Sequence, residues 1–268
     1  MVLRHDDAGV LAVGQASHAW LCGQFARAWG NDRFGTVEPL EEVALGAEQH
    51  DVGMAAWDLD PVREPATGLP QSFMQMGARA NAGLWSAGPQ RLITQTRYAA
   101  LLAVMHGRRL YEAFDLAAAS AADGEAVTAF LRHAAALEAS LLSALRADPF
   151  SAPHATAERV RRNSSLVWTW DLISLALLLG WAPRTLPAVP AAGGRSIDVA
   201  LAPVAGRPLA AVLDPWPFRA PEVRVHCEGR RLTHGFADDE ALREGLAQAP
   251  WETVEFTLIA GAQLREGT

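Results

Sequence analysis

The sequence predicts an α+β protein that is mainly a helical bundle with a small β-sheet. Apolar residues recur at helical spacing through most of 17–180, apolar and polar residues alternate in the last third, and the first 13 residues have a hairpin pattern. We therefore expect a helical domain with an amino-terminal hairpin at 1–180. A linker rich in Pro, Ala and Gly should follow at 181–195, and a small β-rich region at 196–268 should pack on the helical body.

The individual elements follow from local signals. A turn at Asp6–Gly9 should close the hairpin, and Pro39 is a favoured residue in the first turn of a helix. Asp123 is a candidate helix cap, and the proline-rich segment 58–71 should form a loop or lid. Helices are expected at 17–30, 39–54, 90–114, 124–146, 155–180 and 238–248, and alternation predicts strands at 223–227 and 254–258.

Composition excludes several classes of chemistry. The 268 residues contain no lysine, so all 23 positive side chains are Arg, and a Walker-type phosphate loop or a Schiff-base lysine is ruled out. The net charge of −7 gives no overall attraction to nucleic acid or to an anionic membrane. The amino terminus lacks an apolar signal core, and Cys22 and Cys227 form no CxxC pair, so we expect a cytoplasmic protein with reduced thiols. A homo-oligomer is possible.

Asp171 is the most informative residue of the chain. It lies within the apolar run 166–179, which is too short to span a bilayer, and no basic residue is near it in sequence. An ionised carboxylate on a buried helix costs several kcal/mol unless a cation or strong hydrogen bonds compensate it. His18, His50 and Asp51 should also point inward, so we predict that these four residues bind a divalent metal ion.

The predicted ligand set suits a transition metal. Imidazoles and carboxylates together favour Mn, Fe, Co, Ni or Zn, and they leave coordination positions open for water. His106, a third inward histidine, is a candidate for a second ion or for a catalytic contact. Histidines of this kind are also found as hydrogen-bonded core residues, and a hydrogen bond between His106 and Asp171 would satisfy both groups without a metal.

Four further residues are candidates for contacts with a substrate. Arg161 and Arg162 could clamp a phosphate in bidentate fashion, although arginines on a first helical turn are commonly solvated. Trp57 and Asp58 follow the His50–Asp51 doublet, where they could instead form a pocket wall and cap a turn.

The order of these residues resembles two families. The succession of a helical His, a His-Asp doublet and a late Asp, here His18, His50–Asp51 and Asp171, is similar to the HD-domain superfamily of metal-dependent phosphohydrolases. A larger part of the sequence resembles an uncharacterised bacterial family, the domain of unknown function 3891 family. The segments that carry this resemblance are QASHA with WGNDRF, EQHDVG with WD, MHGRRLY, and RN with WDLIS, which together span roughly residues 1–180.

The HD resemblance implies an HD-domain-like helical bundle and a hydrolytic function. About 120 residues separate the doublet from Asp171, so the helices around His106 would have to be an insertion or an elaborated core. The hypothesis is a hydrolase of a small phosphorylated metabolite or nucleotide that acts through metal-bound hydroxide, with one or two ions. A di-iron oxygenase and a non-catalytic sensor that binds a metal or an anion are the alternatives.

Overall fold

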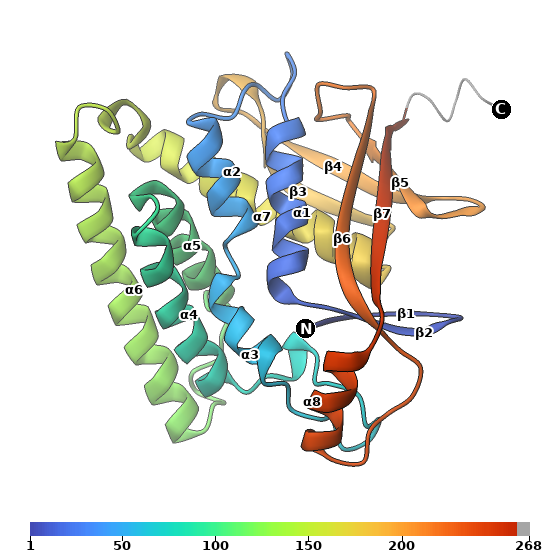
Figure 1. Ribbon diagram of the computed structural model, residues 1–268. Helices are drawn as coiled ribbons and strands as arrows, with labels where there is room; N and C mark the ends of the chain where they lie inside the picture. The colour runs from blue at the N-terminus through green and yellow to red at the C-terminus, as the bar shows by residue number, and fades with distance from the viewer. Residues whose placement is uncertain (262–268) are drawn as a thin grey trace.

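The computed structural model describes residues 1–261, which form one sheet and a set of helices beside it (Figure 1). The strands are β1 (Val2–Asp6), β2 (Gly9–Val13), β3 (Arg184–Pro190), β4 (Ser196–Val204), β5 (Arg207–Asp214), β6 (Glu222–Leu232) and β7 (Trp251–Ala260). The α-helices are α1 (Gln15–Ala28), α2 (Leu40–Glu48), α3 (Ala55–Leu59), α4 (Ala78–Ile93), α5 (Arg97–Leu110), α6 (Ala121–Ala147), α7 (Ala157–Leu179) and α8 (Asp239–Gln248). Short 3-10 turns are η1 (Val52–Met54), η2 (Phe73–Gln75), η3 (Ala152–His154) and η4 (Ala192–Gly194).

The prediction of a mainly helical bundle is wrong, because the sheet is a principal layer of the molecule. Helices account for 50% of the structure and strands for 23%, an α/β composition. All seven strands belong to one mixed sheet in the order β1-β2-β6-β7-β5-β4-β3, with β5 and β7 parallel and the other neighbours antiparallel. The amino-terminal hairpin is confirmed, and it extends this sheet by pairing β2 with β6.

The sheet was underestimated because several of its strands contain residues that are rare in strands. Part of the segment expected as a linker forms β3, although it contains Pro187 and Pro190. Proline is tolerated there because β3 is an edge strand and its pairing with β4 shifts register between Leu186 and Val189. Pro203 likewise lies where the register of β4 against β5 shifts. Pairing in the folded chain thus overrides a weak local preference for strand.

Most predicted helices are confirmed, with shifted ends. The segment expected as one helix at 90–114 is instead the end of α4 followed by α5. Thr96 is the N-cap of α5, and its side chain accepts a hydrogen bond from the Tyr98 amide. The cap of α6 is Ser120 rather than Asp123: the Ser120 side chain accepts from the Asp123 amide. The long helix α7 begins after the Thr156 cap and ends at Gly180, which has the left-handed conformation with φ of 67°.

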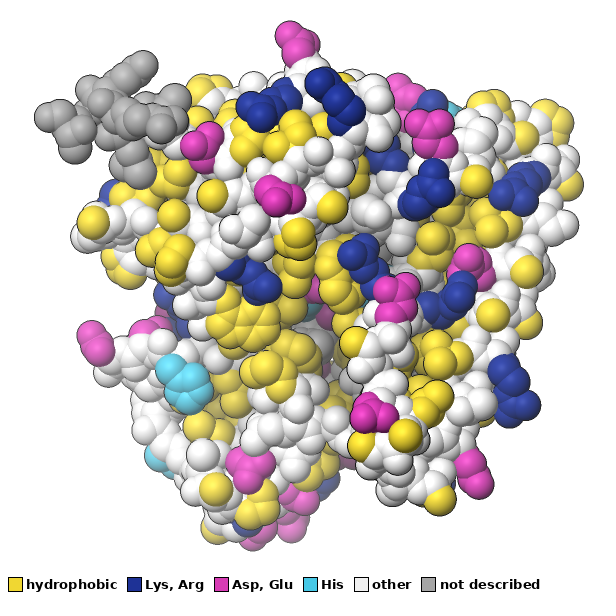
Figure 2. All heavy atoms as spheres, turned by 180° about the vertical axis from the view of Figure 1, so that it is seen from behind, with side chains coloured by type: hydrophobic (Ala, Val, Ile, Leu, Met, Phe, Trp, Pro, Cys, Tyr) yellow, Lys and Arg dark blue, Asp and Glu magenta, His cyan; other side chains and the backbone are white. Residues whose placement is uncertain are grey.

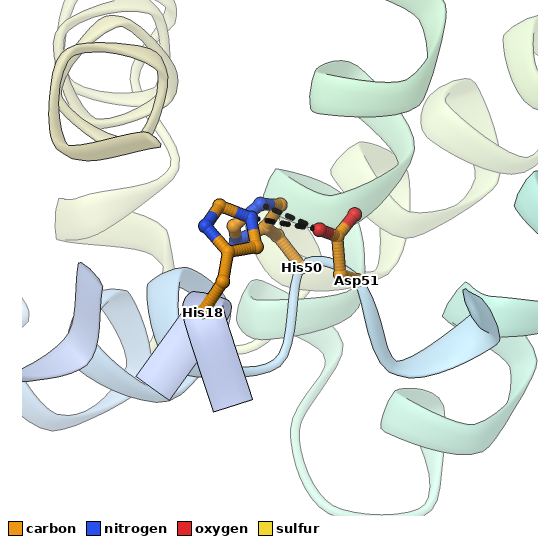
Figure 3. Close-up of side chains that lie close together, drawn as sticks. All are labelled: His18, His50 and Asp51. Atoms are coloured by element: carbon orange, nitrogen blue, oxygen red, sulfur yellow. Dashed lines mark hydrogen bonds and ion pairs between the residues drawn. The ribbon is translucent and has the colours of Figure 1, made fainter. Parts of the chain in front are cut away.

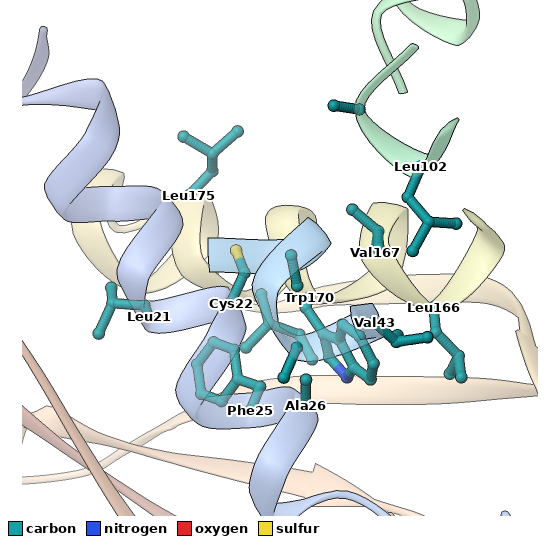
Figure 4. Close-up of a cluster of buried hydrophobic side chains, with 14 of the residues drawn as sticks. Leu21, Cys22, Phe25, Ala26, Val43, Leu102, Leu166, Val167, Trp170 and Leu175 are labelled. Atoms are coloured by element: carbon teal, nitrogen blue, oxygen red, sulfur yellow. The ribbon is translucent and has the colours of Figure 1, made fainter. Parts of the chain in front are cut away.

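Helices α1 and α7 lie between the sheet and the other helices, and they carry the centre of the core (Figure 1). Figure 4 shows apolar side chains of α1, α2, α5 and α7 packed together, among them Phe25, Val43, Leu102 and Trp170. All four are fully buried. Polar side chains on the inner faces of these helices are therefore held in a rigid, close-packed environment.

The predicted lid, residues 58–71, is held by contacts with other parts of the chain. Residues 58–71 contain a bridge between Arg63 and Pro70, and the Arg63 amide donates to the Asp239 carboxylate at the start of α8. The Phe236 amide donates to the Gly68 carbonyl. These contacts anchor the loop on the α8 side of the molecule, where it lies in Figure 1.

Charges of both signs are interspersed on the surface seen in Figure 2, and hydrophobic side chains border a hollow near the middle of that face. No described helix combines the length and the apolar character that a bilayer crossing requires.

Gly53 positions the segment that follows the doublet. A Cβ atom at Gly53 would press on the Leu84 carbonyl oxygen and lie 3.0 Å from the Gly88 Cα of α4. We expect Gly53→Ala to lower the free energy of unfolding by about 1–3 kcal/mol through overpacking. Gly83→Ala, at a position in α4 with open space around it, is the matched control and should raise stability by about 0.5–1 kcal/mol. Urea denaturation measures both, and equal effects would contradict the close-packing argument.

Candidate metal centre

Five side chains converge from four parts of the chain. His18 comes from α1, His50 and Asp51 come from the turn between α2 and η1, His106 comes from α5, and Asp171 comes from the middle of α7. Their exposed fractions are between 1% and 5%. The fold therefore brings together the four predicted metal ligands and His106, the candidate for a second ion. In the sequence these five residues are spread over more than 150 positions.

The doublet lies just beyond the helix that precedes it. Helix α2 ends at Glu48, and the backbone has left helical geometry at Gln49 (φ −119°, ψ 8°) and at Asp51 (φ −95°, ψ 14°). Adjacent residues within a helix point about 100° apart, which would separate the two side chains. The turn allows His50 and Asp51 to face one point, and Figure 3 shows the His18 and His50 rings turned toward one oxygen of the Asp51 carboxylate.

The distances between donor atoms suit a metal ion. Nε2 of His18 lies 3.0 Å from Oδ2 of Asp51 and 3.4 Å from Oδ1 of Asp171. Nε2 of His50 lies 3.5 Å and 3.6 Å from the same two oxygens. With metal–ligand bonds of about 2.1 Å, neighbouring ligands are about 3.0 Å apart in an octahedral site and about 3.4 Å apart in a tetrahedral one. The donor atoms of His18, His50 and Asp51 therefore lie close enough together to hold one ion, and Asp171 lies beside two of them.

A backbone acceptor selects the tautomer of His50. Its Nδ1 lies 2.7 Å from the Ala47 carbonyl oxygen, which can only accept, so Nδ1 carries a proton and donates. In the neutral ring, Nε2 then has a lone pair. Nε2 is also buried and has no hydrogen-bond partner among the described residues. A hydrogen bond from the opposite ring nitrogen is the usual way in which proteins orient a metal-binding imidazole.

Ser174 selects the tautomer of His18. The Ser174 hydroxyl donates to the Asp171 carbonyl oxygen at 2.8 Å, so it has no proton left to give. Nδ1 of His18, 2.8 Å from the Ser174 oxygen, is therefore the donor of that contact. The lone pair of the neutral ring is then on Nε2, which faces Asp51 and Asp171. Two lone pairs thus face two carboxylates, an arrangement that needs a cation between them.

A proton can supply that charge when no metal is bound. Burial opposes the charged form of His50, but Asp51 and Asp171 outweigh it and raise the pKa of His50 to about 9. Burial likewise opposes the ionisation of Asp51, but His50 and His18 lower its pKa to about 2. The pKa of Asp171 is also lowered, because its interactions with His50 and with the other neighbouring histidines outweigh the effect of burial. The carboxylates are therefore charged at neutral pH.

His106 completes a second, overlapping set of donors. Its Nε2 lies 3.8 Å from Oδ2 of Asp171, the oxygen that faces away from His18 and His50. Burial, with the charge of His50, lowers the pKa of His106 to about 4, so the ring is neutral at pH 7. Donor atoms of His50, His106 and Asp171 form one potential metal-binding triad, and those of His18, His50 and Asp51 form the other.

The four predicted substrate contacts lie apart from these donors or have other partners. Arg161 is exposed, and Arg162 donates to the Phe34 carbonyl oxygen at 2.8 Å. Asp58 accepts from the Gln15 amide at the start of α1 and lies 3.0 Å from the amino group of Met1. These contacts position α1, which carries His18 on its first turn. Trp57 is partly buried against the main core.

Sequence reasoning gave no role to Ser174 or Arg109 beside the donors, and it read Trp168 as core or pocket wall. Ser174 follows Asp171 by three positions on α7, Trp168 precedes it by three, and Arg109 follows His106 by three on α5. Residues three apart share a helix face, so this spacing was the available signal. The Trp168 ring centroid lies 5.4 Å from that of His106, and the Arg109 guanidinium carbon lies 4.3 Å from the Trp168 centroid.

Comparison with known protein families identifies the family of this chain. Neither the curated proteins nor the solved structures contain a match to this chain, and the HD-domain resemblance finds no support in these comparisons. The family model described as "Protein of unknown function (DUF3891)" matches residues 1–234, which is most of the chain. The chain therefore belongs to the DUF3891 family.

Proposed function

We propose that the protein is a metal-dependent hydrolase of a small phosphorylated substrate. The observation that carries the proposal is the direction of the His18 and His50 lone pairs, which hydrogen bonds at the opposite ring nitrogens aim at two charged carboxylates. Neutral imidazoles and carboxylates are ligands of Mn, Fe, Co, Ni and Zn. The second triad around His106 gives room in this proposal for one ion or two.

The residues divide into distinct roles under this proposal. His18, His50, Asp51 and Asp171 would hold the ion, and Ser174 would orient His18. A bound divalent ion supplies a nucleophile at neutral pH because it lowers the pKa of a coordinated water. Asp51 would accept a proton from that water or orient it, and a neutral His106 would contact a phosphoryl oxygen or the second ion.

A non-catalytic metal-binding module is the second candidate, and it is favoured by burial. Ligand side chains that are at most 5% exposed suit a closed structural or sensor site, whereas a catalytic site keeps positions open to substrate. A di-iron oxygenase would use the same two triads. Iron content together with oxygen uptake separates that reading from hydrolysis.

Elemental analysis of the purified protein tests the proposal first. We expect near-stoichiometric Mn, Fe, Co, Ni or Zn in the wild type and its loss in the double variant His50→Ala, Asp51→Ala. The chain offers a matched control: His5 and Asp6 form a second His-Asp doublet, which is exposed on the hairpin, and its double alanine variant should retain the metal. Hydrolysis of p-nitrophenyl phosphate and bis(p-nitrophenyl) phosphate should follow the metal content.

Two results would contradict the proposal. One is a wild-type protein that binds none of these ions after reconstitution with each in turn. The other is a metal-loaded protein that hydrolyses neither ester while its unfolding temperature depends strongly on the metal, which would favour the non-catalytic module.

A further inference from the structure

Arg109 lies beside the candidate metal centre and stacks on an aromatic ring there. Its guanidinium stacks on the Trp168 ring, with 4.3 Å between the guanidinium carbon and the ring centroid. The side chain is partly buried, and within residues 1–261 it has no ion pair or hydrogen bond. Glu112 is near enough to influence its pKa, but burial has the larger effect and lowers that pKa. At neutral pH a guanidinium remains charged, so Arg109 is a partly desolvated cation that forms no ion pair with a carboxylate in the described part of the chain.

The location of this pair ties it to the metal centre. Arg109 lies one turn after His106 on α5, and Trp168 lies one turn before Asp171 on α7. His106 contacts Trp168, with 5.4 Å between their ring centroids, and its Nε2 lies 3.8 Å from Asp171. The stacked pair is thus adjacent to the side of the cluster formed by His106 and Asp171, and it is more exposed than they are.

We propose that Arg109, held against Trp168, binds the phosphoryl group of the substrate beside the metal centre. This inference rests on the proposed function, since it names the residue that recognises the substrate's anionic group. Stacking covers a face of the guanidinium but leaves its N–H edges free. Those edges match two oxygens of a phosphate in bidentate geometry.

Trp168 has a positioning role in this arrangement. An unsupported arginine side chain loses much rotational freedom when it binds a ligand, and stacking on an indole reduces that loss because the planar group is already oriented. Trp168 contacts both His106 and Arg109, so in this proposal its ring supports the arginine beside the cluster.

Titration calorimetry with inorganic phosphate tests the assignment, using proteins whose metal content has been measured. We expect Arg109→Met to weaken phosphate binding about 10- to 100-fold, the usual effect of losing hydrogen bonds to a charged group. Arg109→Lys keeps the positive charge but loses the bidentate geometry, so its phosphate affinity should lie between those of the wild type and Arg109→Met. It replaces Arg109→Met in the test if that variant does not fold. The matched control is Arg108→Met: Arg108 is the preceding residue, but its guanidinium pairs with Glu138 of α6, so phosphate affinity should not change.

The outcomes separate this inference from the proposed function. Unchanged phosphate affinity in a metal-loaded Arg109→Met protein would overturn the role of Arg109 and leave the hydrolase proposal standing. Absence of phosphate binding to the wild type at millimolar concentration would overturn the inference as well. Phosphate binding that depends on Arg109 in a protein that takes up no metal would support an anion site and contradict the metal-dependent hydrolase.

Discussion

Asp171→Asn should reduce phosphate-ester hydrolysis by at least about 1000-fold in protein supplied with excess metal, while changing the free energy of unfolding by only about 1 kcal/mol. The amide has nearly the same shape as the carboxylate, so packing within α7 is preserved. It lacks the negative charge that Asp171 gives to the triad with His50 and His106 and, through Oδ1, to the neighbouring Nε2 of His18. Loss of the charge shared by a catalytic metal centre removes most of the stabilisation that the ion gives to the transition state.

Steady-state hydrolysis of bis(p-nitrophenyl) phosphate and urea denaturation measure the two effects of Asp171→Asn. Asp32→Asn is the control, because Asp32 is an exposed aspartate whose side chain has no partner among the residues described. A structural metal site would give the opposite pattern: a large fall in unfolding temperature, with no metal-dependent hydrolysis in the wild type to lose. The relative size of the two effects therefore separates the hydrolase from the non-catalytic module.

The helices could be predicted from sequence more fully than the sheet, for a physical reason. In α1 the buried residues repeat at helical spacing, and α7 contains an apolar run that ends at Gly180, so local sequence contains the signal. Strands β3, β4 and β5 are rich in Ala and Pro, which are uncommon in strands. Their strand conformation depends on partners distant in the chain, such as the parallel pairing of β5 with β7. The sequence of a single segment does not show which distant strand it pairs with.

Charge burial made the cluster of the candidate metal centre predictable, whereas the residues around it depend on tertiary packing. A carboxylate such as Asp171 in an apolar run requires compensation wherever it is buried, and this requirement pointed to inward histidines. Motif alone would not have sufficed, because His5–Asp6 is also a His-Asp doublet and is exposed. Arg162 was a poor candidate for the site in retrospect: it precedes Asp171 by nine residues, which is about 13 Å along a helix.

The affinity of the metal-free protein for a divalent ion should rise about tenfold for each pH unit between pH 7 and 9. His50 has a pKa of about 9 in the folded, metal-free protein, so its Nε2 holds a proton at pH 7 that the ion must displace. The groups that face it are His18 from α1, Asp51 from the same turn, His106 from α5 and Asp171 from α7. Asp51 is ionised throughout this range and His106 is neutral, so neither adds a second proton.

Proton competition has a definite sign, which calorimetry can measure directly. Below pH 9 the proton on His50 is the competitor of the ion, so lowering the pH weakens binding; above pH 9 the competitor is gone and the dependence should end. Titration of Mn²⁺ at pH 7 in two buffers of different ionisation enthalpy should therefore show release of about one proton per ion. Heats that are identical in the two buffers would mean that the lone pair of His50 is free in the apoprotein. The cation that compensates Asp51 and Asp171 would then have to come from elsewhere.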